Sequence, residues 1–500
     1  MTDQIRDYPP DDLTLKVRNW LADEVYPGLL NEPFDARAAA VWIDGSNGFV
    51  SLWVSGYGKH LPPLERVEFC QHELFRRIEA VKRQAARVTP GPGQSVSRPL
   101  VGPLRIVNKL FADDTGYRRV LFCSWFPALR ILRDHPQEFE RQINVITDAC
   151  YQGFRTFFTV GGWSTYWDGR EVAPVRFRKW HHSRETGLHR PASLGAWIDA
   201  WPDYDDLLRT LLRACKQRGL RLHQAVGDMQ IIFPDRAGMQ AELEFTRRVA
   251  RICAQEGGRE VMALVGDTNE YPQNRWGSES PEAIAQMGRV LRIWEEEIPG
   301  VLTTMGACIS EEPEQLYQSI THGQVCAVHT SRGVPFALKR THALTHWEGQ
   351  YRHFPKPFWQ GEPMGWGQAV SVDRFDRYSN ADGVALYAMH ALVGHASNYF
   401  NGPAIHSREP LESTWGFYEI PRLLAETLPE DVATWANASN GRGGIAYWFK
   451  HKRFATATHK DWDTSPPQPV ADWTLYTGDA VQHGTGTPPR ASGLIVGTFK

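Results

Sequence analysis

The chain has 500 residues, 42% of them hydrophobic, and a formal net charge of −2 at pH 7. This nearly neutral balance excludes the strongly basic surface that binds nucleic acids or anionic membranes, and no apolar run of about 18 residues predicts a membrane-spanning helix. The first residues include acidic side chains where a signal peptide would be basic. We therefore expect a cytoplasmic protein, with association with a particle or release by another route as alternatives. Composition leaves the oligomeric state open.

The N-terminal part ends at residues 89–95, a segment of Pro, Gly and Ser residues with the composition of a linker. Before it, apolar spacing predicts a helix at 13–21, strands at 38–43 and 49–54, and a charged helix at 64–87. We therefore predict a small α/β extension over residues 1–95. It carries no recognisable catalytic motif, and attachment, oligomerisation and packing against the next domain are alternative roles.

Strand and helix patterns alternate from residue 96 to residue 428, which favours a parallel sheet surrounded by helices. Helical spacing is clearest at 139–150, 207–215, 239–253, 284–298 and 417–428. Strands are predicted at 119–123, 156–160, 220–226, 261–265, 301–305, 325–328, 357–359 and 397–400. Eight such strands predict an α/β fold of the (β/α)8 TIM-barrel type over residues 96–428, with an open doubly wound sheet as the alternative.

After residue 428 the helical period fades, and short strands are predicted at 444–449, 454–458, 473–476 and 494–499 between turns rich in Gly and Pro. This pattern predicts a small antiparallel β unit over residues 429–500. Packing against the barrel is one interpretation, and a carbohydrate-binding module is the other.

Two glutamates stand where predicted barrel strands give way to loops. Glu270 ends the segment Asp267-Thr268-Asn269-Glu270 after the fourth strand, and Glu362 follows Phe358-Trp359 of the seventh. The catalytic residues of barrel enzymes lie at the carboxyl ends of the strands, and a pair of carboxyl groups there is typical of enzymes that cleave glycosidic bonds.

Residues 100–428 resemble clan A of the glycoside hydrolases, the retaining (β/α)8-barrel enzymes that include cellulases, mannanases and β-galactosidases. In that clan an Asn-Glu pair after strand four supplies the acid/base, and a Glu after strand seven is the nucleophile. The resemblance implies that Glu270 is the acid/base, that Glu362 is the nucleophile and that the substrate is a carbohydrate.

The chain departs from the cellulase-like family of this clan in several places. An Arg late on strand two and a His late on strand three are usual there, whereas Gly161-Gly162-Trp163 and Gly227-Asp228 follow the strands predicted here. His329 resembles the His position after strand six, but Ser331 stands where a Tyr is usual. The resemblance therefore extends to the clan and not to one family.

Further residues at the predicted loop face are candidates for substrate binding. Asn269 could bond a sugar 2-hydroxyl or cap a turn, Asp228 could line a subsite or cap the next helix, and His329 could bond the nucleophile or serve the scaffold. Flat tryptophan faces can stack on sugar rings, and we single out Trp163 and Trp366. The other tryptophans predicted near this face are Trp125, Trp167, Trp276 and Trp359.

The sequence thus predicts a retaining glycoside hydrolase acting on a β-linked oligo- or polysaccharide. The alternative is a barrel without catalysis that binds glycans or serves as a structural component, for example of a phage tail. The sequence has no HExxH, phosphate-binding GxxxxGK[ST], GxSxG or dinucleotide-binding motif. His181-His182 and His189 could bind a metal, but they form no recognised metal-binding motif, so we expect neither a metal nor another cofactor.

Overall fold

The computed structural model of the chain describes residues 99–158, 202–225, 236–267, 281–306, 322–329, 356–363, 365–366, 379–401, 411–413, 416–439 and 446–500. The predicted extension at 1–95 lies outside these residues, so its structure and the predicted domain boundaries stay predictions. No helix of the described part is long and apolar enough to cross a membrane.

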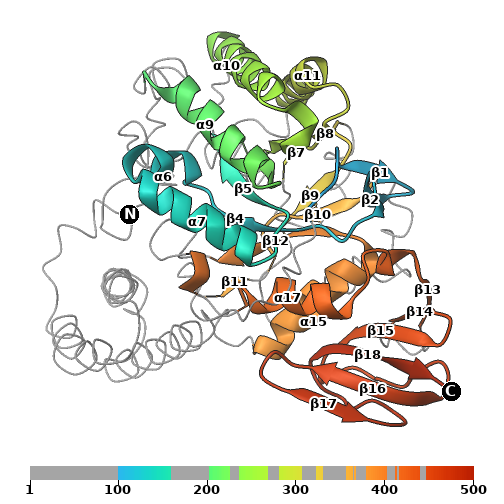
Figure 1. Cartoon of the computed structure of the whole chain (residues 1–500). Helices are drawn as coiled ribbons and strands as arrows, with labels where there is room; N and C mark the ends of the chain where they lie inside the picture. Colours follow the sequence, from blue (N-terminus) through green and yellow to red (C-terminus); the bar gives the residue numbers. More distant parts are fainter. Residues whose placement is uncertain are drawn as a thin grey trace, which may run out of the picture.

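Eight parallel strands form the centre of the molecule (Figure 1). They are β4 (Leu121–Ser124), β5 (Gly153–Phe157), β6 (Arg221–Ala225), β7 (Met262–Asp267), β8 (Leu302–Thr303), β9 (Cys326–Val328), β10 (Phe358–Gln360) and β12 (Ala396–Asn401). Their order in the sheet is β8-β7-β6-β5-β4-β12-β10-β9. The ring closes because the amides of Gln324 and Val325, just before β9, donate to the Thr303 carbonyl of β8 at 2.8 and 3.0 Å. The predicted (β/α)8 barrel is confirmed.

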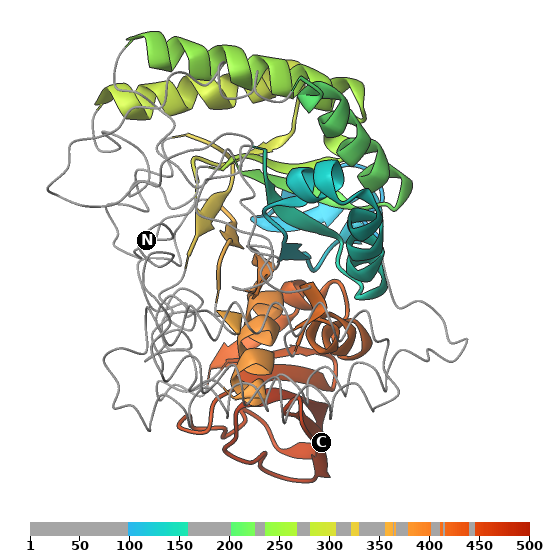
Figure 2. The same ribbon diagram turned by 90° about the vertical axis from the view of Figure 1, so that its left-hand side faces the viewer.

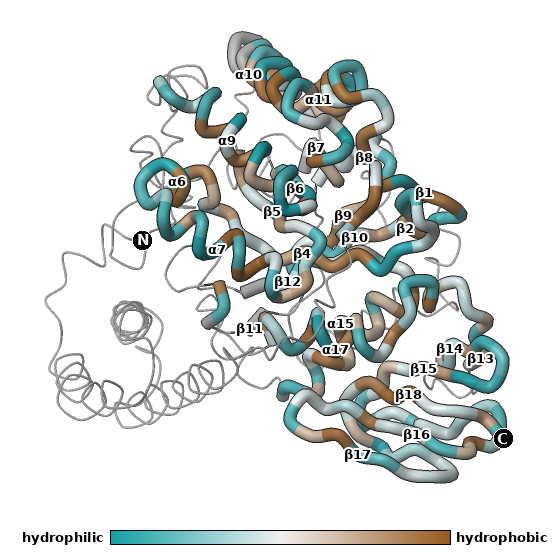
Figure 3. Tube along the Cα trace, in the orientation of Figure 1, coloured by the Kyte–Doolittle hydropathy of each residue, from teal (hydrophilic) through white to brown (hydrophobic). Residues whose placement is uncertain are grey.

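The described helices pack along the outside of the barrel (Figures 1 and 2). On α9 the apolar residues Leu208, Leu211, Leu212 and Cys215 recur every three or four positions, and this spacing buries one face of the helix. Hydrophilic and hydrophobic residues accordingly alternate along α10 (Figure 3). The described helices are α6 (Ala128–Asp134), α7 (Pro136–Asp148), α9 (Tyr204–Gln217), α10 (Arg236–Gln255), α11 (Pro281–Glu297), α15 (Asn380–Val393) and α17 (Glu419–Thr427), with short 3-10 turns η4 (Gly258–Glu260), η6 (Leu411–Ser413) and η7 (Val432–Thr434).

A small antiparallel sheet closes the amino-terminal end of the barrel, which we call the base. It consists of β1 (Arg105–Val107), β2 (Leu110–Asp113) and β3 (Gly116–Tyr117). Phe111 of β2 packs with the apolar residues of the barrel interior, and its ring meets the edge of Trp359 at a centroid distance of 5.6 Å. Apolar side chains therefore fill the barrel from below.

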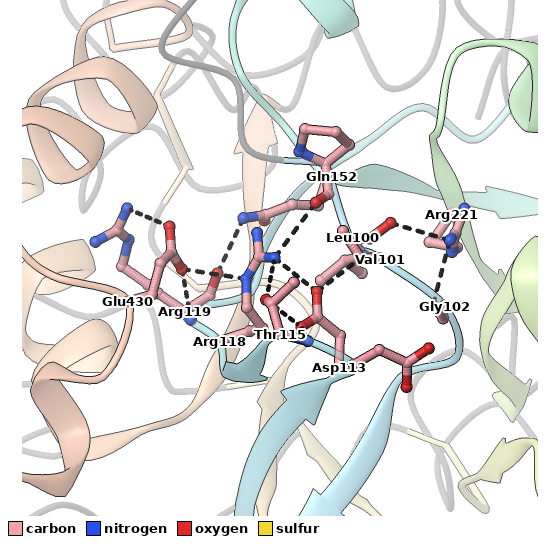
Figure 4. Close-up of polar contacts among 12 residues, drawn as sticks. Leu100, Val101, Gly102, Asp113, Thr115, Arg118, Arg119, Gln152, Arg221 and Glu430 are labelled. Carbon is pink, nitrogen blue, oxygen red and sulfur yellow. Dashed lines mark hydrogen bonds and ion pairs between the residues drawn. The ribbon is translucent and has the colours of Figure 1, made fainter.

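Polar contacts join this sheet and the segments next to it to the amino-terminal ends of the barrel strands (Figure 4). Asp113 is buried beside Arg118, whose Nη1 donates to its carboxylate at 2.6 Å. Arg221, the first residue of β6, donates to the carbonyl of Leu100 at 3.1 Å, and Glu430 accepts from the backbone amide of Arg119 at 3.0 Å. The last contact ties the residues that follow α17 to the start of β4.

The C-terminal residues form an antiparallel sheet of order β13-β14-β15-β18-β16-β17, which confirms the predicted β unit. Helix α15 lies between this sheet and the barrel (Figures 1 and 2). Because both of its sides are covered, every residue from Asp382 to Leu392 is buried. The strands are β13 (Ala436–Ser439), β14 (Ala446–Lys450), β15 (Arg453–Thr458), β16 (Val470–Tyr476), β17 (Val481–Gly484) and β18 (Gly493–Phe499).

The predicted position of the second barrel strand is wrong by three residues at each end, since 156–160 was expected and β5 spans Gly153–Phe157. The strand begins at a glycine because a Cβ at Gly153 would lie 2.0 Å from the carbonyl oxygen of Arg221 on the adjacent strand. The shift brings Arg155 into the strand. Charged residues are rare in buried strands, so the apolar residues after Arg155 misled the prediction.

Candidate active site

Glu362 lies at the carboxyl end of the barrel, two residues after β10 ends at Gln360. Its side chain is 5% exposed, and its Oε1 accepts a hydrogen bond from Nη1 of Arg155 at 2.8 Å. Nδ1 of His329, which follows β9, lies 3.7 Å from Oε2. The second, sixth and seventh barrel strands thus bring a cation, an imidazole and a carboxylate together in a buried place.

Arg155 is fully buried on β5, the second strand of the barrel. Its guanidinium carbon lies 5.1 Å from the ring centre of Phe126 and 5.7 Å from that of Phe157. Contacts of this kind stabilise a cation, and the ion pair with Glu362 offsets the cost of removing both charges from water. Arg155 was not predicted as a site residue because strand two was expected three residues later than β5 lies.

His223 is the second residue that the sequence analysis missed. It lies on β6, the third barrel strand, with no exposed surface. Its ring meets the edge of Trp359 at a centroid distance of 5.0 Å, and Nδ1 lies 3.3 Å from Nδ2 of Asn398 on β12. An Arg on strand two and a His on strand three are therefore present, and the statement that Gly161-Gly162-Trp163 and Gly227-Asp228 replace them is wrong.

The other predicted site residues are described only in part. Glu270, Asn269, Asp228 and Trp163 lie outside the described residues, although β7 ends at Asp267, three positions before Glu270. Trp366 belongs to β11 (Gly365–Trp366), whose backbone pairs with β12 at Asn401. The backbone of Trp366 therefore lies at the carboxyl end of the eighth barrel strand.

Two of the tryptophans expected near the loop face are core residues. Trp125 has no exposed surface and stacks on Phe139 of α7 at a centroid distance of 5.3 Å. Trp359 is equally buried and packs inside the barrel against Phe111 and Phe122. Aromatic residues at strand ends were assigned to the surface, whereas these two fill the spaces between elements.

No group of three or more His, Cys, Asp and Glu side chains within the described ranges could hold a metal ion. The described polar groups around Glu362 include a guanidinium and an imidazole, which are suited to hold a carboxylate. The arrangement fits chemistry carried out by a side-chain carboxylate.

No protein-family model and no curated protein matches the chain. Solved structures with a similar fold include a protein described as a glycoside hydrolase, 12% identical with a TM-score of 0.48, over 79% of this chain and 97% of that one. A family 5 glycoside hydrolase from Bacteroides vulgatus is also 12% identical, with a TM-score of 0.48 over 79% of this chain and 94% of its own.

A β-glucanase from Saccharophagus degradans, solved with cellotetraose, is 12% identical, with a TM-score of 0.42 over 67% of this chain and 98% of its own. These are similarities of fold. The functional conclusion depends on the side chains around Glu362.

Proposed function

We propose that this protein is a retaining glycoside hydrolase that cleaves a β-linked oligo- or polysaccharide by double displacement. The observation that carries the proposal is Glu362, a buried carboxylate at the carboxyl end of the seventh barrel strand, paired with Arg155 of the second strand at 2.8 Å. Barrel enzymes carry out their chemistry at this end of the strands.

In the first step the Glu362 carboxylate would attack the anomeric carbon while Glu270 gives its proton to the departing glycosidic oxygen. A C–O bond to Glu362 forms as the glycosidic bond breaks. In the second step Glu270 would take a proton from water, whose oxygen attacks the same carbon and releases Glu362. Two inversions leave the configuration of the sugar unchanged.

The neighbours of Glu362 suit a nucleophile. A carboxylate must be ionised and correctly aimed to attack, and Arg155 supplies a fixed positive charge on Oε1 at 2.8 Å. His329, with Nδ1 at 3.7 Å from Oε2, lies on the other side of the carboxylate. The second carboxyl group would have to lie about 5 to 5.5 Å away for retention, and in the sequence Glu270 comes three positions after Asp267, where the fourth strand ends.

The first test is hydrolysis of aryl β-glucosides, β-mannosides and β-galactosides and of plant and bacterial polysaccharides, with the product anomers followed by NMR. We expect retention of configuration in wild type and loss of turnover in Glu270→Gln and Glu362→Gln. Absence of turnover on the whole panel, with glycan binding unchanged by either substitution, would instead favour the barrel without catalysis.

A second test identifies the nucleophile directly. A 2-deoxy-2-fluoro glycoside with a good leaving group should glycosylate Glu362 as the leaving group departs, and the fluorine should slow the release of the sugar, so the intact mass rises by one fluorosugar. Peptide mapping should place the label on Glu362, and Glu362→Gln should remain unlabelled. A label on another carboxylate would contradict the assignment.

A further inference from the structure

A buried amide lies inside the barrel beneath the candidate nucleophile. Asn398 is the third residue of β12, has no exposed surface, and pairs across the sheet with Phe122 of β4. Its side-chain amide contacts three groups, namely the indole of Trp359, the carbonyl of Gly361 and the ring of His223. Burial of a polar side chain costs free energy unless its polar atoms are hydrogen-bonded. The three contacts of Asn398 offset this cost.

The contact with Trp359 determines which way the amide faces. Indole Nε1–H can only donate, and it lies 3.0 Å from Oδ1 of Asn398. Reversing the amide would place two donors against each other. The nitrogen Nδ2 must therefore be the atom that faces Gly361 and His223.

This orientation in turn determines the protonation of His223. Nδ2 carries two hydrogens, of which one is donated to the Gly361 carbonyl at 3.0 Å. The other faces Nδ1 of His223 at 3.3 Å, so Nδ1 must accept it with its lone pair. A neutral imidazole whose Nδ1 is an acceptor carries its hydrogen on Nε2.

The same amide holds the backbone next to Glu362. The carbonyl of Gly361 accepts from Asn398 of the eighth strand, and the amide of Gly361 donates to the carbonyl of Val328 at 2.8 Å on the sixth. Gly361 is therefore held from both sides at the residue directly before Glu362. Catalytic groups need such support, because a displacement of about 1 Å can reduce the rate roughly 10²-fold.

From these contacts we infer that Asn398 is a positioning residue, which aims Glu362 through the Gly361 carbonyl and keeps His223 as the Nε2–H tautomer. The inference concerning Glu362 rests on the proposed glycosidase function, whereas the tautomer of His223 can be measured without any activity. Asn398 acts through Gly361 and His223 and has no assigned contact with the substrate.

The tautomer is tested by two-bond ¹H–¹⁵N NMR on protein labelled with ¹⁵N-histidine, with His223→Gln identifying the signal among the 18 histidines. Wild type should show unprotonated Nδ1. In Asn398→Asp, a carboxylate oxygen faces Nδ1 and should move the hydrogen onto it. Trp359→Phe removes the group that orients the amide and should give a mixture of tautomers. An unchanged His223 signal in Asn398→Asp would overturn this part of the inference.

Kinetics test the positioning of Glu362. Asn398→Asp places a second oxygen against the Gly361 carbonyl, and we expect kcat to fall about 10²-fold with KM changed less than about threefold. Gln286→Met is the matched control, because Gln286 is also a buried amide, but it bonds Glu242 between α10 and α11, away from Glu362.

The control should lose stability while keeping kcat, and a loss of kcat in Asn398→Asp no larger than in the control would overturn the positioning role. Failure of the proposed function is a different result, since wild type itself would then show no turnover.

Discussion

Each end of the barrel buries an arginine beside a carboxylate, and the two pairs obtain their partners differently. At the base, Asp113 accepts from the amides of Val101 and Thr115, the hydroxyl of Thr115 and Arg118, at 2.6 to 2.8 Å. These donors lie within 12 residues of Asp113 along the chain. At the opposite end, Arg155 stands 207 residues from Glu362.

The difference indicates what each pair is for. A carboxylate that accepts hydrogen bonds from its own loop fixes the local structure of that loop, and at the base it holds the small sheet together. The pair of Arg155 and Glu362 exists only when the second and seventh strands share one closed barrel. A functional group assembled in this way depends on the whole fold, and the predictions below separate the two cases.

The largest effect should come from Glu362→Gln. The amide is nearly the same size and can still accept from Arg155, but it cannot attack an anomeric carbon. We expect turnover to fall by roughly 10⁴-fold or more, together with a loss of stability, because the buried charge of Arg155 is left without its carboxylate. Asp113→Asn is the matched control at the base and should keep its turnover. Equal losses of turnover in the two variants would contradict the division of roles.

Arg155→Met should have the next largest effect, because it leaves Glu362 buried without its guanidinium partner. Removal of one member of a buried ion pair costs on the order of 3 to 5 kcal/mol, and urea titration should show a loss in this range. Arg155→Met with Glu362→Met replaces the whole pair by apolar side chains and should recover much of that stability. A double variant as unstable as the sum of the single ones would show that the pair is not coupled.

The eight barrel strands could be predicted from the sequence because each is a short apolar run between turns. Helix α15 was not predicted, since a helix covered on both sides shows no alternation of polar and apolar faces. Glu362 was found because it follows a recognisable strand. Arg155 was missed because a register error of three residues excluded it from the predicted second strand. His223 lies inside the predicted third strand, but Gly227-Asp228 after that strand was taken as the site position instead. The role of Asn398 depends on contacts across the barrel that no local pattern contains.

Asp113→Asn should destabilise the protein by about 2 to 3 kcal/mol. The loss is smaller than for Arg155→Met because Nε of Arg118 keeps Glu430 at 3.5 Å.

Burial acts to raise the pKa of Asp113, but the hydrogen bonds from Thr115 and Val101 and the charge of Arg118 lower it below its ordinary value. The stability that this carboxylate contributes is therefore present above about pH 4 and is lost as the pH falls through the folded pKa. Urea titrations from pH 7 to pH 3 should show a weaker acid dependence in Asp113→Asn than in wild type.

His390 offers a third case, a buried titratable group for which the described residues provide no ionic partner. The ring has no exposed surface, and within the described part of the chain neither nitrogen has a hydrogen-bond partner. Burial, and then the neighbouring His395, lower the pKa of His390 far below its ordinary value. Since the unfolded chain binds a proton that the folded chain excludes, stability is complete above about pH 6.5 and falls by about 1.4 kcal/mol per pH unit below it.

His390→Phe keeps a ring against Tyr387 and His395 and cannot be protonated. We expect this variant to lose less stability than wild type between pH 7 and pH 5, as measured by urea titration. His483→Ala is the control, because His483 is an exposed histidine of the C-terminal sheet and its loss should leave the acid dependence as in wild type. If His390→Phe kept the full acid dependence, other groups would be its cause. If the dependence decreased, the acid sensitivity between pH 7 and pH 5 would arise at His390 on α15, whereas the pair at the base contributes only below about pH 4.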